Sequence, residues 1–334
     1  MIIMTELPQM KTRKRHIFGG VFLVVLVVVA ATVVLKRDWI YDWYRGVSYQ
    51  PSSEMVTIRD ELGLTNRGEF LFNAAQPVLN TAADFNLNCR QDESEVAVLG
   101  CYTAGNIYIY DVKDAKLAGI RELTTAHELL HANWARMSES EQRELTESLT
   151  RVFEVNQEML GEEIDSYDIS EKQEELYVRA GTEVKDLPET LEKHFAEIFK
   201  DQDKIVDFYE SYIAVFRRIK TEMETLEEEI ELMKGEIETR ITEYERQLSQ
   251  LEADIVSFNS CAEVVGCFQN ENDFNARRAA LVERQNELNT LNDEINELVD
   301  AYNEKIDDYN ANAMEGRELQ NMIDSKAEIL KIKQ

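Results

Sequence analysis

The stretch TTAHELLH, residues 124–131, has the most specific chemistry in this chain of 334 residues. His127 and His131 are four residues apart, so on an α-helix their imidazoles lie one turn apart on one face and can bind a single metal ion. Glu128 lies beside them, in a position to hold a water molecule. The chain has 4 histidines, and two of them have this spacing. The stretch therefore predicts a helix that carries a metal site.

A second interpretation of the same stretch needs no metal. Thr125 and Glu128 have the spacing of a capping box, in which the glutamate side chain reaches back to the start of a helix. Both histidines would then be ordinary helix residues near a surface. The preceding residues, 117–123, also have a helical pattern and can begin the helix earlier.

The His-Glu-x-x-His arrangement resembles that of the zinc peptidases known as zincins. The resemblance implies that His127 and His131 bind Zn²⁺, that a third protein ligand completes the shell, and that a water occupies the open position. It also implies that Glu128 takes a proton from that water and returns it to the leaving amine. The substrate would be a peptide or a protein.

The third zinc ligand is expected to be acidic, because no histidine follows at the short spacing of the three-histidine class. The predicted helix at 171–183 resembles the source of the glutamate ligand in one branch, the gluzincins. Glu175 is the first candidate, because a carboxylate among apolar neighbours is costly unless a metal compensates it. Glu183 is the second, since Gly181 allows close backbone approach. Arg179 stands where that branch has a downstream acid.

A zinc peptidase also needs an electrophile that stabilises the oxyanion of the reaction. Tyr177, Arg179 and His194 are the nearest donors in the sequence, and His194 is the first candidate. Each of them has a structural alternative: a half-buried tyrosine, an ion pair with Glu175 or Glu183, and a surface histidine.

Two strands are expected before the metal-binding helix. Residues 96–99 form one, and residues 107–112 form the stronger one, because they are β-branched or aromatic almost throughout. Turn residues at 104–106 join the two into a hairpin. The second strand resembles the edge strand that lines the zincin cleft, along which an extended substrate adds. A plain core strand is the alternative.

An apolar run without charges at residues 17–35 has the length of a transmembrane helix. Four cations precede the run and two follow it: Lys11, Arg13, Lys14 and Arg15, then Lys36 and Arg37. The positive-inside rule then places a cytoplasmic tail at 1–16 and the body outside a cell membrane that the chain crosses once. A cleaved signal peptide is the alternative, and it too predicts an exported body.

Acidic residues outnumber basic ones, 65 to 36, which gives a formal net charge of −29. This charge argues against nucleic acid or anionic lipid as a partner of the body. The 4 cysteines form two local pairs, Cys89 with Cys101 and Cys261 with Cys267, which suit disulfides in an oxidising compartment. Four free thiols remain the alternative.

Residues 205–312 have spaced hydrophobes that predict two coiled-coil helices joined by a loop at 259–272. Such helices fold back as an antiparallel hairpin. The hairpin can serve as a spacer, bind a protein partner or mediate self-association. Residues 313–334 are expected to be a short helix or a C-terminal tail.

These features together predict an α+β fold: a mainly helical, zincin-like domain with a small β-sheet at 36–204, after one transmembrane helix and before the hairpin. The expected function is that of a membrane-anchored, extracytoplasmic zinc peptidase. The alternative is a non-catalytic envelope scaffold whose coiled coil binds or activates another protein. Replacement of Glu128 by glutamine separates them, because only the peptidase needs that carboxylate.

Overall fold

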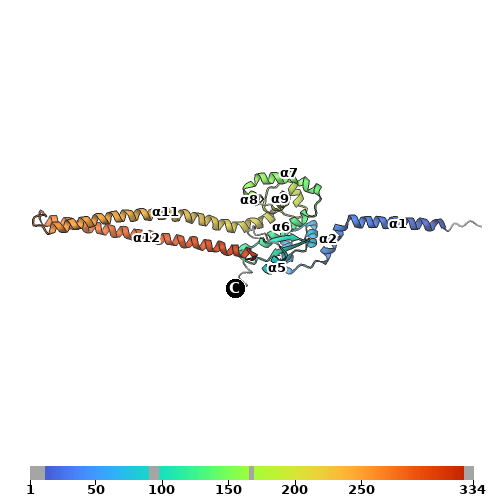
Figure 1. Ribbon diagram of the computed structural model, residues 1–334, viewed down its shortest axis with the longest axis horizontal. Coiled ribbons are helices and arrows are strands. Elements are labelled where there is room, and N and C mark those ends of the chain that lie inside the picture. The colour runs from blue at the N-terminus through green and yellow to red at the C-terminus, as the bar shows by residue number, and fades with distance from the viewer. Residues whose placement is uncertain (1–11, 90–97, 165–168, 327–334) are drawn as a thin grey trace, which may run out of the picture. The chain divides into compact units, whose positions relative to one another are not determined.

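The computed structural model describes residues 12–89, 98–164 and 169–326, and the chain divides into two compact units (Figure 1). The first unit consists of the described residues up to Tyr212 and those from Met322 onward, and the second runs from Ile213 to Asn321. The fold is mainly helical with one small sheet, which confirms the predicted α+β class at that level. The first two residues of the strand predicted at 96–99 lie outside the described residues.

Helices make up most of the first unit. Their bounds are α1 Thr12–Leu35, α2 Arg37–Ser48, α3 Ser53–Leu62, α4 Asn66–Ala75, α5 Ala82–Asn88, η1 Ala115–Leu117 (a 3₁₀ turn), α6 Ile120–Trp134, α7 Glu139–Val155, α8 Gln157–Ile164, α9 Ile169–Glu183 and α10 Glu189–Phe195. Side-chain oxygens of Ser52, Thr65, Thr81 and Ser138 cap four of these helices. At the start of α7, Ser138 and Glu141 form a capping box.

The sheet has three strands in the order β1-β3-β2, which are Val78–Asn80, Asn106–Tyr110 and Gly100–Thr103. β3 pairs with β1 in parallel and with β2 in antiparallel register. The hairpin turn is Ala104-Gly105, and both residues have positive φ (49° and 81°), as a two-residue turn between twisted strands requires.

The interpretation of residues 107–112 as an edge strand is wrong. β3 ends at Tyr110 and lies in the centre of the sheet, where Ile107 and Ile109 are fully buried. The β-branched and aromatic side chains that predicted a strand here are those of a strand in the core. The edge strand that packs on α6 is the less apolar β2.

The predicted membrane span at 17–35 falls within α1, which is helical throughout. Across the described residues, no helix combines the length and the apolar character that a membrane crossing requires. The helix is therefore confirmed, and its insertion in a membrane stays a prediction.

The core of the first unit gathers around α6 and α9. Its largest fully buried side chains include Tyr177 of α9, Phe195 of α10 and Phe72 of α4. α2 is tied to this core by charged groups, because the Arg136 guanidinium, just beyond α6, binds the Asp42 carboxylate of α2 at 2.8 and 3.0 Å. Arg136 also donates to the hydroxyl of Tyr102 in β2.

Both predicted cysteine pairs lie at disulfide-bonding distance, which confirms them. In the first unit, the bridge from Cys89 to Cys101 joins the end of α5 to β2. β2 is therefore fixed from two sides, by its hydrogen bonds to β3 and by a covalent link.

The second unit is a hairpin made from most of α11, Asp203–Ala262, and most of α12, Glu271–Ile323, which run side by side (Figure 1). Ion pairs between the two helices join Arg218 to Glu315, Glu229 to Lys305 and Arg240 to Glu294. The partner's number falls as the position along α11 rises, so the helices are antiparallel, as predicted. Leu251, Leu288 and Ile295 are buried along the seam.

Candidate metal centre

α6 begins well before the two histidines. Gly119, with φ of 91°, precedes its first residue, Ile120, so Thr125 lies in the helix interior. There the Thr125 hydroxyl donates to the carbonyl of Arg121 rather than capping a helix. The capping-box interpretation of Thr125 and Glu128 is therefore wrong, and Glu128 is free to turn its carboxylate away from the helix start.

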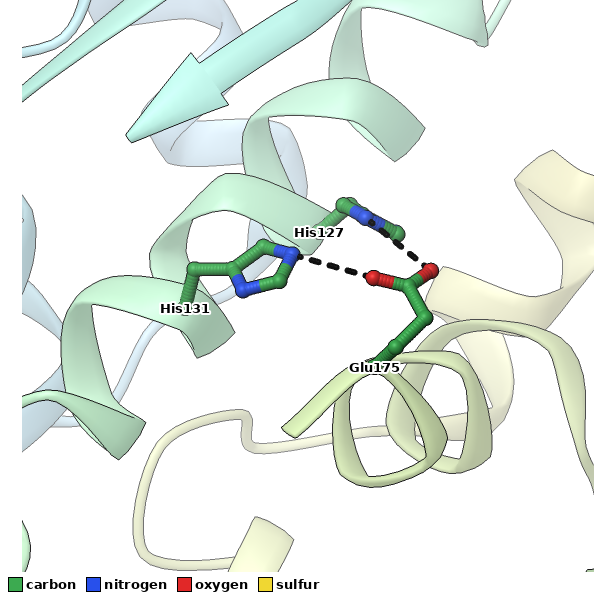
Figure 2. A group of neighbouring side chains, drawn as sticks. All are labelled: His127, His131 and Glu175. Carbon is green, nitrogen blue, oxygen red and sulfur yellow. Dashed lines mark ion pairs between the residues drawn. The ribbon is translucent and has the colours of Figure 1, made fainter. Parts of the chain in front are cut away.

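His127, His131 and Glu175 come together between α6 and α9 (Figure 2). One ligand atom from each lies within 4.8 Å of the others. Nε2 of His127 is 3.9 Å from Oε1 of Glu175, and Nε2 of His131 is 3.5 Å from Oε2. Figure 2 shows both imidazoles directed toward the carboxylate. Among the residues that the structure describes, these three form the one group of histidine, cysteine or acidic side chains that lie close enough together to share a metal ion.

A second carboxylate orients His131. Oε1 of Glu174 lies 2.8 Å from Nδ1 of His131, so the other ring nitrogen, Nε2, faces Glu175. Metal-binding histidines commonly hold a carboxylate in this way, which fixes the ring and makes its free nitrogen a better ligand. Sequence reasoning missed this role of Glu174. The sequence signal for this role was the position of Glu174 directly before Glu175, in a helix that presents both residues to α6.

The two histidines and the neighbouring glutamates shift one another's pKa values. Burial lowers the pKa of His127 to about 4. Burial acts in the same direction on His131, but the hydrogen bonds that its ring donates to Glu174 and Glu175 outweigh it and raise that pKa to about 10. Burial would raise the pKa of Glu175, yet its contacts with both histidines hold that pKa at about 2. The carboxylates thus favour a positive charge between the imidazoles, and a cation bound there would replace a proton.

Glu128 leaves α6 on the side that faces β2. The residue is only 5% exposed, and burial raises the pKa of its carboxyl to about 7, while the backbone N–H of Tyr102 donates to it and opposes that rise. A Cβ atom on Gly100 would lie 2.7 Å from Oε1 of Glu128, so only glycine leaves room for the carboxylate. Sequence reasoning missed both Gly100 and Tyr102, which become neighbours of Glu128 through strand pairing alone.

The other predicted site residues have different partners. The Glu183 carboxylate binds the guanidinium of Arg179 at 2.8 and 3.0 Å, and both side chains are largely shielded from solvent. Of these two glutamates, Glu175 is therefore the one that lies with the histidines. Nε2 of His194 lies 3.0 Å from the hydroxyl of Tyr177, which is fully buried in the core. His194, Tyr177 and Arg179 are each engaged in the packing of the domain.

No protein-family model, no curated protein and no solved structure matches this chain. The resemblance to zincins therefore depends on the HELLH stretch and on the geometry around it. That geometry fits a zinc ion in its donor set, because two imidazole nitrogens and one carboxylate oxygen form the protein shell of many catalytic zinc sites and leave a fourth position open.

Proposed function

We propose that this chain is a zinc-dependent peptidase. The observation that carries the proposal is the convergence of His127, His131 and Glu175, with the buried Glu128 next to two of them in the same helix. His127, His131 and Glu175 would hold the ion, and Glu174 would orient His131. Zinc, when bound, lowers the pKa of a water to about 7 and polarises a carbonyl group.

Glu128 is the proton carrier in this proposal. Its raised pKa of about 7 lies close to neutral pH, so its carboxylate can accept a proton and its acid form can give that proton to a leaving amine. The N–H of Tyr102 holds the carboxylate in one orientation. No catalytic role is assigned to His194, because its contacts are with Tyr177 and its ring packs against Phe195.

An extended peptide is the substrate that the sheet would accept. β2 forms one edge of the sheet, and Gly100 and Tyr102 of this strand flank Glu128. A peptide that adds to such an edge is held by main-chain hydrogen bonds, with little demand on its side chains. We therefore propose that the scissile bond lies alongside β2.

As for location, we propose that α1 anchors the chain in a membrane, with the site on the extracytoplasmic side.

A non-catalytic scaffold is the second candidate function, and the hairpin is the observation that favours it. Its helices, α11 and α12, have 60 and 53 residues, far more than a peptidase site requires. A scaffold would use the first unit as a platform for that hairpin. The peptidase needs the carboxylate of Glu128, and the scaffold does not.

The test is zinc content and peptide hydrolysis by the purified full-length protein. We expect one zinc per chain by plasma mass spectrometry, lost in His127→Ala and Glu175→Ala, and kept in Glu183→Gln as a matched control on the same helix as Glu175. Hydrolysis of a quenched-fluorescence peptide library should follow the zinc. Wild-type protein that takes up no zinc would rule out the peptidase, and zinc uptake without hydrolysis of any peptide would favour the scaffold.

A further inference from the structure

The far end of the hairpin is closed by a constrained loop. We call residues 261–267 the hairpin tip. The disulfide between Cys261 and Cys267 closes it, and Gly266, with φ of 86°, allows the sharp reversal before the second cysteine. Antiparallel helices can be joined by a loop of about 2–5 residues without any covalent bridge. The tip is therefore built more rigidly than chain reversal alone requires.

Side chains on both helices support the tip. Phe258, Phe268 and Phe274 form a cluster whose ring centroids are 5.1 to 5.3 Å apart. On the α12 side, the Asn270 side chain accepts from the N–H of Asp273, and the Asp273 carboxylate accepts from the N–H of Gln269. These contacts connect the residues on either side of the tip to one another and to α12.

The most exposed large apolar side chains of the tip belong to two consecutive valines. Val264 is 61% exposed and Val265 is 103% exposed, the highest exposure among the large apolar side chains described. A single exposed apolar residue on a protein surface needs no explanation. Here, however, two neighbouring β-branched side chains lie on a loop that a disulfide closes. The loop therefore holds both side chains in place before a partner binds. Preorganisation of this kind lowers the entropic cost of binding.

The charge of the hairpin restricts what can bind it. Residues 213–321 contain 26 Asp+Glu and 11 Lys+Arg, and the loop at 259–272 contains Glu263 and Glu271 without any Lys or Arg. An anionic membrane surface would repel this end, because membrane-binding segments rely on basic residues. A tip-to-tip contact between two copies would bring like charges together.

We infer that the hairpin tip is a docking site that inserts Val264 and Val265 into an apolar pocket, rimmed by Lys or Arg, on a different protein. The apolar pocket would remove the two side chains from water, and its basic rim would meet Glu263 and the acidic helices behind the tip. This inference is independent of the metal centre, since every residue that carries it lies in the second unit.

The test is site-directed photo-crosslinking of the full chain in cells that naturally contain it. A photoreactive amino acid replaces Gln269, which is exposed beside the tip. The matched variants are Val264→Thr with Val265→Thr, which keep the side-chain shape, and Val282→Thr on α12 as the control, because Val282 is 46% exposed away from the tip. We expect one protein adduct whose yield falls at least about tenfold in the tip variant and is unchanged in the control.

The mapped site of that adduct should combine apolar residues with Lys or Arg, and a Val265→Lys variant should abolish the adduct by repulsion from the basic rim. Intact mass and circular dichroism would verify that each variant keeps its disulfide and helices. The inference is overturned by an adduct between two copies of this chain, by lipid adducts alone, by no adduct, or by an adduct that the tip variant forms as well as the wild type.

Discussion

Glu128 is the residue whose chemistry is most easily separated from zinc binding, because it is near His131 and Glu175 but is not one of the three side chains that would share the ion. We predict that Glu128→Gln keeps one zinc per chain and lowers kcat for peptide hydrolysis by about 10²- to 10⁴-fold or more, as loss of a general base does. The measurement is steady-state kinetics with zinc content determined on the same samples. Activity near the wild-type level would remove Glu128 from the mechanism.

Glu174 tests whether the hydrogen bond to His131 tunes the metal site. We predict that Glu174→Gln weakens zinc affinity by about 10- to 100-fold, because the amide is a poorer acceptor for the imidazole N–H. Competition with a fluorescent chelator would measure this affinity. Glu171→Gln on the exposed part of α9 is the matched control and should bind zinc like the wild type. Equal affinities for all three proteins would show that Glu174 plays no part.

Sequence reasoning located the two histidines and Glu128 because a single helix relates them. It also proposed Glu175 from an argument about burial, and the structure brings Glu175 to the histidines. The choice between Glu175 and Glu183 needed the packing of α9 on α6, since Arg179 is within reach of either acid along its own helix. Contacts between separate helices, such as these, do not produce a repeating pattern of residues in the sequence.

Among the elements, β2 connects the sheet to the candidate site, and Gly100 is its point of closest approach. A Cβ at Gly100 would lie 2.6 Å from Thr124 and 2.7 Å from Glu128, so we predict that Gly100→Ala displaces Glu128 and lowers hydrolysis at least about tenfold. Gly235→Ala in α11 is the control, because no atom lies within 4 Å of its added Cβ.

The Gly235→Ala control should have normal activity and a hairpin more stable by about 1 kcal/mol, since alanine is the better helix former. Thermal unfolding followed by circular dichroism would show this gain. A Gly100→Ala protein with wild-type kinetics would contradict the placement of β2 against Glu128.

The elements that sequence reasoning predicted well have a strong local pattern of residue types. The heptads of the hairpin and the β-branched run of β3 belong to this class. The order of the strands could not be predicted in the same way, because β3 became central only by pairing with β1, a strand of three residues with few local signals. Sequence reasoning therefore expects the edge position for the more apolar strand, whereas β2 is the edge strand in the structure.

At the scale of the whole molecule, the three proposed zinc ligands all lie in the first unit. Zinc should therefore stabilise that unit and leave the hairpin unchanged. We predict two calorimetric transitions, of which a chelator lowers only one, and zinc at about 1,000 times its dissociation constant restores about 4 kcal/mol to it. A chelator that shifts both transitions equally, or neither, would contradict this assignment.

The contact between Asp42 and Arg136 has a mechanical consequence. Two hydrogen bonds fasten α2 to the residue just beyond α6, and the same guanidinium holds the Tyr102 side chain of β2. A load applied along α2 would thus pass through one guanidinium to both the helix that carries the histidines and the strand that positions Glu128. The segment that follows α1 and the geometry of the candidate site are therefore not independent parts, and strain in the first would be transmitted to the second.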